Sequence, residues 1–279
     1  MTALKIDAHH HLWRLSRGDY GWLTPDLAAI HRDFGVEDLA PLLRAAGVDR
    51  TILVQAAPTR AETLYLLDIA AQSALIGGVV GWADFEAPDA AEQIATLAAR
   101  PKLKGLRPMI QDIEDDAWML RPELEPAITA MTANGLTFDA LLKPRHLPIL
   151  ARFADRYPGL AIVIDHAAKP DIAGGDVAGW ARDIRTVAAQ TSATCKLSGL
   201  MTEARPGCSA EDLRPVFDIL IEAFGAERLM WGSDWPVLNL NGAYEVWHEI
   251  AGALTQNLPS PDRDWIFGGT AEAFYGIAT

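Results

Sequence analysis

The feature that most constrains the fold is a regular alternation of short apolar segments with amphipathic helical patterns. Segments with the length and composition of buried strands occur at residues 4–8, 51–55, 78–82, 103–107, 136–142, 161–165, 194–197 and 229–232. Helical patterns rich in Ala, Leu, Glu and Arg lie between them, for example at residues 36–46, 62–73, 90–99, 147–156 and 213–224. Eight alternations of strand and helix predict an α/β fold whose strands close into a parallel (β/α)8 barrel, the TIM barrel.

An open, doubly wound parallel sheet is the alternative architecture, because it uses the same alternation of elements. No glycine-rich phosphate or dinucleotide loop follows any predicted strand, which disfavours that alternative. The length of 279 residues suits one barrel and no linker divides the chain, so we expect a single domain over residues 1–279. We expect the last amphipathic segment, residues 262–275, to pack outside the barrel.

The charge of the chain limits its partners. A formal net charge of -13 opposes binding to nucleic acid or to anionic lipid, since both need a cationic surface. No run of about 18 apolar residues occurs, so no membrane span is predicted. The first residues lack the long apolar stretch of an export signal, and we therefore expect a cytoplasmic location. The sequence leaves the oligomeric state open.

Two histidines stand at the end of the first predicted strand. Side chains two positions apart in a strand point to the same side, so we expect His9 and His11 to face the barrel interior and His10 to face away. Two neutral imidazoles that converge at a barrel mouth can bind a divalent cation or orient a water molecule. A strand end whose histidines are merely solvated, or a remnant of an affinity tag, is the simpler alternative.

Polar residues also follow two later strands. His166 comes directly after Asp165 at the end of a buried strand, where a charged pair is costly unless something uses it. Asp234 follows the last strand within the segment Trp-Gly-Ser-Asp-Trp-Pro. Each has a structural alternative, because His166 could cap the next loop and Asp234 could cap a helix or begin a turn.

Taken together, these motifs resemble the amidohydrolase superfamily. Asp-x-His-x-His on the first strand, apolar-Asp-His on a later one and Trp-Gly-Ser-Asp-Trp-Pro on the last are similar in particular to the amidohydrolase-related lactonases. That group contains L-fuconolactonase, L-rhamnonolactonase-like proteins and 2-pyrone-4,6-dicarboxylate lactonase. Further similarity extends along nearly the whole chain, at residues 32–34, 54–56, 104–107, 196–199 and 268–275.

The resemblance implies roles for the motif residues. The polar cluster of His9, His11, His166 and Asp234 would bind and activate the hydrolytic water. Asp234 would be the general base that takes a proton as water attacks the ester carbonyl. Arg107, at the end of the fourth predicted strand, would contact the substrate, with a salt bridge between two strand ends as its structural alternative.

Three further side chains near the predicted mouth suit a sugar ring. Trp13 and Trp82 lie at or just after strand ends, where flat aromatic faces match a sugar, although a core position is an equal alternative for each. Gln55 can bond hydroxyl groups. We expect a neutral polyhydroxylated lactone rather than a dicarboxylate, because Arg107 is the only arginine that ends a predicted strand. The arginines in loops, whose reach the sequence does not reveal, are Arg60, Arg121, Arg145 and Arg205.

The expected metal content departs from that of the metal-dependent members of the superfamily. Those members usually add a histidine, a bridging lysine or a glutamate from the fourth or fifth strand, whereas residues 136–142 offer no histidine. No cofactor is therefore certain, and a binuclear centre is not expected. The prediction is at most one weakly bound divalent ion, zinc or manganese, on His9, His11 and Asp234.

Three classes of function follow from these observations. We favour a hydrolase that opens a sugar-acid lactone of the L-fuconolactone type with water. The alternatives within the superfamily are a decarboxylase or lyase and a pyrone dicarboxylate lactonase. A sugar-binding barrel without catalytic activity is the third class, and turnover of any lactone would exclude it.

Overall fold

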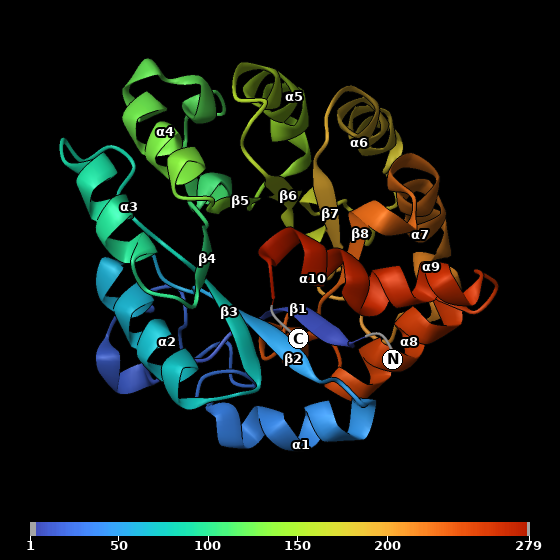
Figure 1. Cartoon of the computed structure of the whole chain (residues 1–279). Helices are drawn as coiled ribbons and strands as arrows, with labels where there is room; N and C mark the ends of the chain where they lie inside the picture. Colours follow the sequence, from blue (N-terminus) through green and yellow to red (C-terminus); the bar gives the residue numbers. More distant parts are fainter. Residues whose placement is uncertain (1–3, 278–279) are drawn as a thin grey trace.

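Over residues 4–277, which the computed structural model describes, eight parallel strands form a barrel surrounded by helices (Figure 1). The strands are β1 (Ile6–His10), β2 (Arg50–Val54), β3 (Ile76–Gly81), β4 (Leu103–Leu106), β5 (Thr137–Ala140), β6 (Ile162–Ile164), β7 (Thr194–Leu197) and β8 (Leu229–Trp231). They lie in sequence order, and each pairs in parallel with the next. The predicted barrel architecture is confirmed.

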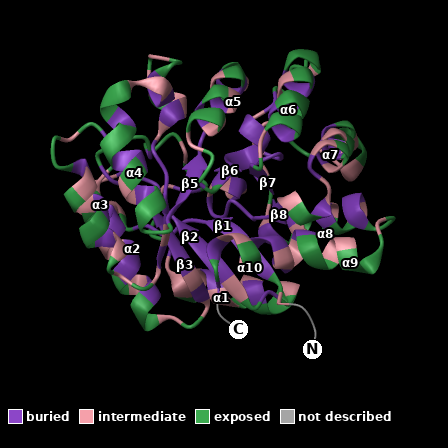
Figure 2. Cartoon of the chain, turned by 45° about the horizontal axis from the view of Figure 1, so that its top comes forward, coloured by how far each residue is buried: buried purple, intermediate pink, exposed green. Residues whose placement is uncertain are grey.

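The helices between the strands cover the outside of the barrel. They are α1 (Val36–Ala46), α2 (Arg60–Gln72), α3 (Ala90–Ala98), α4 (Glu125–Ala133), α5 (Leu147–Arg156), α6 (Ala178–Gln190), α7 (Ala210–Phe224) and α8 (Tyr244–Thr255). Each buries one face and exposes the other, as Figure 2 shows. In α5, for example, Leu147, Leu150 and Phe153 recur at helical spacing and are buried. Gly47 ends α1 in the left-handed conformation that glycine adopts without strain.

The barrel closes through backbone bonds between the residues at the end of β1 and those that follow β8. The amide of His11 donates to the carbonyl of Trp235 at 2.7 Å, and the amide of Asp234 donates to the carbonyl of His9 at 2.8 Å. These bonds place Asp234 beside His9 at the end of β1 and His11 just after it.

Predicted and observed strand bounds differ by a few residues, for physical reasons. The first strand was expected at residues 4–8, but β1 continues through His10, which pairs with Leu53 of β2. The segment predicted at residues 136–142 is longer than β5, because Leu141 and Leu142 are buried beyond the end of the strand. An apolar run marks burial, and burial continues into the loops at this end of the barrel.

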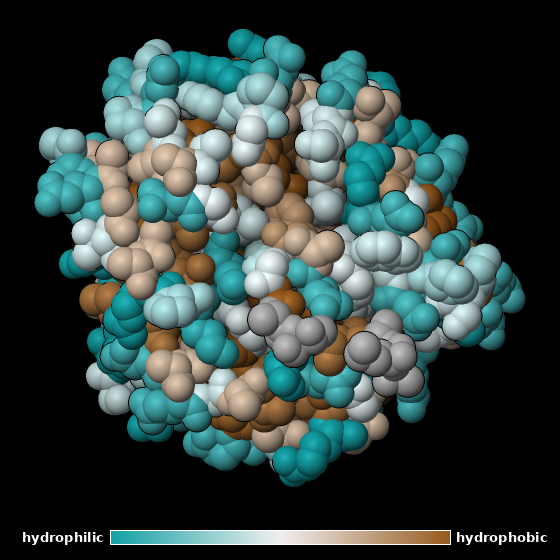
Figure 3. Space-filling view, in the orientation of Figure 1, coloured by the Kyte–Doolittle hydropathy of each residue, from teal (hydrophilic) through white to brown (hydrophobic). Residues whose placement is uncertain are grey.

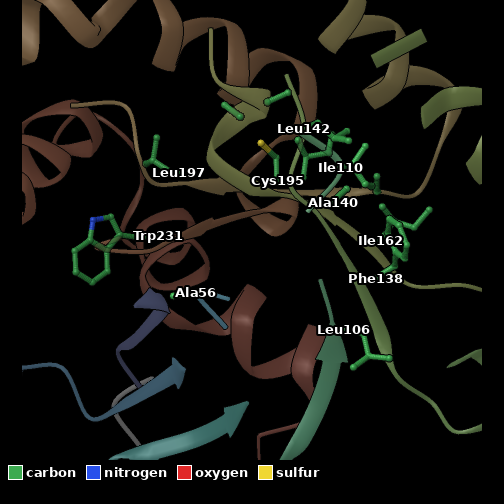
Figure 4. Close-up of a cluster of buried hydrophobic side chains, with 14 of the residues drawn as sticks. Ala56, Leu106, Ile110, Phe138, Ala140, Leu142, Ile162, Cys195, Leu197 and Trp231 are labelled. Carbon is green, nitrogen blue, oxygen red and sulfur yellow. The ribbon is translucent and has the colours of Figure 1, made fainter. Parts of the chain in front are cut away.

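Two groups of apolar side chains pack on the two sides of the sheet. Outward-pointing residues, including Phe138, Ala140, Cys195 and Leu197, contact the helices and belong to the larger cluster (Figure 4). The smaller cluster fills the barrel and includes Ile6, Ala8, Ile52, Val54, Val80, Val163 and Met230.

The last helical segment closes the amino end of the barrel, which corrects the expectation that residues 262–275 pack outside it. This segment consists of α9 (Ser260–Asp264), a π-helical turn (Trp265–Gly269) and α10 (Thr270–Tyr275). In Figure 1, α10 lies across the barrel, and Ala271 and Tyr275 join the inner cluster. Figure 3 shows the same end, where mainly hydrophilic side chains cover the outer helices. The carboxyl end remains open for a site.

No helix within residues 4–277 is long and apolar enough to cross a membrane.

Candidate active site

Four polar side chains from three places in the chain converge at the carboxyl end of the barrel. Nε2 of His9 lies 3.2 Å from Nε2 of His11. Oδ1 of Asp234 lies 3.3 Å from Nε2 of His11, 3.7 Å from Nε2 of His9 and 3.8 Å from Nε2 of His166. All four residues are buried. The structure thus brings together the four residues that the motifs single out.

An irregularity in β1 allows His9 to point inward. Asp7 points outward, where its carboxylate accepts a bond of 3.0 Å from the hydroxyl of Tyr244 in α8. Regular alternation would also turn His9 outward. The register with β2 shifts between Asp7 and His10, as at a β-bulge, and bulges commonly redirect side chains near active sites. His9 consequently lies inside the barrel with its Nδ1 3.2 Å from Nζ of Lys196.

The hydrogen bonds of His11 require a positive group between it and Asp234. Nδ1 of His11 lies 2.8 Å from the carbonyl oxygen of Val54 and must carry a hydrogen, because a carbonyl only accepts. Nε2 of a neutral His11 is then an acceptor that faces the carboxylate of Asp234 at 3.3 Å. Two acceptors at this distance repel unless a proton or a metal ion lies between them.

The same atoms fit a single tetrahedral metal ion. Zinc binds imidazole nitrogen and carboxylate oxygen at about 2.0–2.2 Å, which puts its ligand atoms roughly 3.3–3.6 Å apart. The separations among Nε2 of His9, Nε2 of His11 and Oδ1 of Asp234 are 3.2, 3.3 and 3.7 Å. A second possible ligand group, His9 with Asp165 and His166, shares His9 with the first. The residues therefore fit one ion and leave a coordination position open.

Burial and the neighbouring imidazoles set the protonation of His166 and Asp234. It lowers the pKa of His166 to about 4, so this imidazole is neutral at pH 7. Burial alone would raise the pKa of Asp234, but the neighbouring His166, His11 and His9 outweigh it and hold that pKa below its ordinary value. Asp234 is thus an ionised acceptor at neutral pH.

A buried ionic layer supports the four residues from below. Nζ of Lys196 lies 2.7 Å from Oδ2 of Asp139 and 3.0 Å from Oδ1 of Asp165. Nη1 of Arg107 lies 3.2 Å from Oδ2 of Asp165. Burial would raise the pKa of Asp165, but Lys196, His9 and Arg107 hold it well below its ordinary value. The hydroxyl of Tyr275 in α10 donates to Oδ2 of Asp139 at 2.6 Å, which links the helix at the amino end to this layer.

A cavity of about 250 Å³ opens above the four residues. Its lining is partly apolar and partly polar, as is usual for small-molecule sites. The lining residues are His11, Trp22, Ala56, Arg107, Met109, Gln111, Asp112, Leu141, His166, Lys169, Asp234 and Val237. A cavity of about 320 Å³ lies elsewhere, between α8 and α9 beside Lys5, and contains none of the converging residues. We therefore take the cavity above Asp234 as the candidate active site.

Of the four predicted substrate contacts, Arg107 lines the cavity and the other three do not. Arg107 lines the cavity and also pairs with Asp165, so the salt bridge is present and the contact with substrate stays a prediction. Gln55 lies beneath, where its Nε2 donates to the carbonyl of Arg107 at 2.8 Å. Trp13 is fully buried and Trp82 half-buried, and neither belongs to the lining. None of these three residues lines the cavity, and their contacts with a substrate stay predictions.

Trp22 occupies the position in which Trp13 was expected. It stands edge-on to Trp13, with ring centroids 5.6 Å apart, and donates from Nε1 to the carbonyl of Ala56 at 2.7 Å. Its place in the long connection after β1 was the available signal, since long loops at this end build the sites of such barrels.

Known proteins match this chain over nearly its whole length. The sequence profile of the amidohydrolase family matches residues 6–277. An L-fucono-1,5-lactonase of Burkholderia ambifaria is 48% identical over 98% of this chain and 96% of the relative. The L-fucono-1,5-lactonase of Burkholderia multivorans is 37% identical, over 99% of this chain and 97% of the relative. The crystal structure of an amidohydrolase from Burkholderia multivorans with bound zinc is 36% identical, with a TM-score of 0.92 over 99% of this chain and 100% of that chain.

Proposed function

The chain belongs to the amidohydrolase family, and we propose that it is a lactonase that hydrolyses the ester bond of a sugar-acid lactone such as L-fucono-1,5-lactone. The observation that carries the proposal is the convergence of His9, His11, His166 and Asp234 beneath a cavity in which a molecule of monosaccharide size fits. The identity of 48% over nearly the full length of an L-fucono-1,5-lactonase supports the substrate class.

Asp234 acts as the general base. Its ionised carboxylate accepts one proton from a water molecule while the water oxygen attacks the lactone carbonyl carbon. The bond between the acyl carbon and the ring oxygen then breaks. The protonated Asp234 returns the proton to the departing ring oxygen, which becomes a hydroxyl group, and the new carboxylic acid ionises and releases one proton to solvent.

His166 and Arg107 stabilise the negative charge that develops on the carbonyl oxygen. Oγ of Ser198 lies 2.9 Å from Nδ1 of His166, and a hydroxyl that donates there leaves the hydrogen of the neutral ring on Nε2, toward Asp234 and the cavity. The guanidinium of Arg107 faces the same cavity with a permanent positive charge. Donors fixed in a buried site stabilise an oxyanion more strongly than water does.

One divalent ion, zinc or manganese, would be held weakly by His9, His11 and Asp234. When bound, it would lower the pKa of the attacking water. This would help the reaction because the lowered pKa of Asp234 makes its carboxylate a weak base. The zinc bound in the related crystal structure supports the presence of a divalent ion.

A pH-indicator assay with L-fucono-1,5-lactone tests the proposal. We expect the wild-type chain to release one proton per lactone far above the spontaneous rate, with an aldonate as the product. The absence of acceleration with any aldonolactone would refute the proposal. Release of carbon dioxide from an aromatic acid would instead support the decarboxylase alternative.

A further inference from the structure

Four successive residues after β6 adopt a left-handed conformation, although none is glycine. The φ angles of His166, Ala167, Ala168 and Lys169 are 52°, 51°, 58° and 54°. L-residues visit this region singly and seldom in succession, because the Cβ atom meets the neighbouring carbonyl oxygen. Strained backbone of this kind persists only where the surroundings fix it, and it is concentrated at functional sites.

Side-chain and backbone contacts hold this left-handed turn in place. The amide of Lys169 donates to the carbonyl of His166 at 2.8 Å, which closes a turn over the four residues 166–169. Nε1 of Trp180 in α6 donates to the carbonyl of Ala167 at 2.7 Å. Residues three apart in such a turn share one side, and His166 and Lys169 both line the cavity. The strained turn therefore presents a lysine next to a proposed catalytic histidine.

The charge of Lys169 is less neutralised than that of Arg107. These two are the lysine and arginine among the described residues that line the cavity. Arg107 has the carboxylate of Asp165 at 3.2 Å, within the buried ionic layer. The nearest carboxylate oxygen to Nζ of Lys169 is Oε1 of Glu203 at 3.9 Å, which is too long for a direct hydrogen bond. The side chain of Lys169 is 27% exposed, so its ammonium group can turn toward a ligand.

We infer that Lys169 is a substrate-binding residue whose ammonium group binds the carbonyl oxygen of the lactone as that oxygen gains negative charge. It retains the carboxylate of the ring-opened product until release. This inference rests on the proposed lactonase function, because only ester hydrolysis turns a neutral ligand into an anion in this cavity. The other interpretation is that Lys169 and Glu203 merely join two loops.

Two variants separate these interpretations. Lys169→Met removes the charge with little change of volume, and Glu203→Gln breaks the same ion pair but leaves the lysine. We expect Lys169→Met to lower kcat/KM for L-fucono-1,5-lactone by about 10- to 100-fold, the range for a hydrogen bond to a charged group. Glu203→Gln should remain within about threefold of the wild type. Equal losses in both variants would overturn the inference.

Product inhibition provides a readout that a structural role would not change. The inhibition constant of L-fuconate, the ring-opened acid, should rise at least about tenfold in Lys169→Met and stay unchanged in Glu203→Gln. Lys169→Gly serves as a folding control, because glycine adopts a φ of 54° without strain. The melting temperature of this variant should not fall below that of the wild type. If the wild-type chain hydrolyses the lactone and Lys169→Met has the same kcat/KM and the same inhibition constant, this inference alone is overturned. A wild-type chain without lactonase activity would overturn the proposed function and this inference with it.

Discussion

Nε2 of His11 lies 3.3 Å from Oδ1 of Asp234, although the two residues are 223 positions apart in the sequence. The closing bonds between β1 and the segment after β8 create this proximity, because these backbone bonds hold the two chain segments side by side. The site is therefore a product of barrel closure, and the end of β1 must pair with the segment after β8 for the site to form.

Asp234→Asn should lower kcat by at least about 100-fold, because an amide of the same shape cannot accept the proton of water. Asparagine is the suitable replacement, since Asp234 has a φ of 58° and asparagine tolerates this left-handed region better than alanine. Initial rates with the lactone measure the loss of kcat, and thermal unfolding shows whether the variant still folds. A variant with near wild-type turnover would remove Asp234 from the role of base.

Gly199→Ala should impair activity more than stability. A Cβ atom at residue 199 would lie 2.6 Å from Nδ1 of His166 and would displace the ring. Gly135→Ala is the matched control, because Gly135 has the same φ of 65° but no heavy atom within 4 Å of the added carbon. Both variants should lose about 1–2 kcal/mol of unfolding free energy through backbone strain. If both kept full kcat, the position of His166 would not matter for the reaction.

The sequence predicted the barrel and the four converging residues, because their signals are local. Strand periodicity puts His9 and His11 on the same side of the chain, although the bulge in β1 that turns His9 inward has no periodic signal. The ends of parallel strands meet at one face wherever they lie in the chain. The contacts that could not be predicted from the sequence depend on packing between loops that are distant along the chain. Trp22 rather than Trp13 lines the cavity, because the long connection after β1 folds back over Ala56, and no periodicity encodes that path.

Lys196→Met should destabilise the fold far more than Tyr275→Phe. Loss of the ammonium group leaves Asp139 and Asp165 without their shared partner, which costs about 3–5 kcal/mol. Loss of the tyrosine hydroxyl removes one hydrogen bond to Asp139 and costs about 1 kcal/mol. Urea unfolding of both variants measures the difference, and equal small losses would show that the layer is not an energetic unit.

The loss in Lys196→Met should also depend on pH. Burial already raises the pKa of Asp139, and removal of Lys196 raises it further. The folded variant then binds more protons than its unfolded chain, so its unfolding free energy falls as the pH rises. The deficit relative to the wild type should be smaller at pH 5 than at pH 8.

Elemental analysis should find at most one divalent ion per chain. The two possible ligand groups share His9, and Asp165 of the second group is already neutralised by Lys196 and Arg107. Chelation should therefore remove a single weakly held ion, and added zinc or manganese should restore any lost activity. Two tightly bound ions per chain would contradict the assignment.

The enzyme should prefer a neutral sugar lactone to a pyrone dicarboxylate. A carboxylate buried without a partner costs on the order of several kcal/mol, so two carboxylates need several cationic groups that face the ligand. Arg107 already shares its charge with Asp165, and none of the four loop arginines lines the cavity. Lys169 lines it, but one ammonium group can pair with one carboxylate and leaves the second without a partner. Arg121, for example, pairs with Asp115 and Glu86 at the surface. We expect kcat/KM for L-fucono-1,5-lactone to exceed that for 2-pyrone-4,6-dicarboxylate by at least about tenfold, corresponding to about 1.4 kcal/mol in transition-state binding. The opposite order would mean that the loops rearrange to bring those arginines to the ligand.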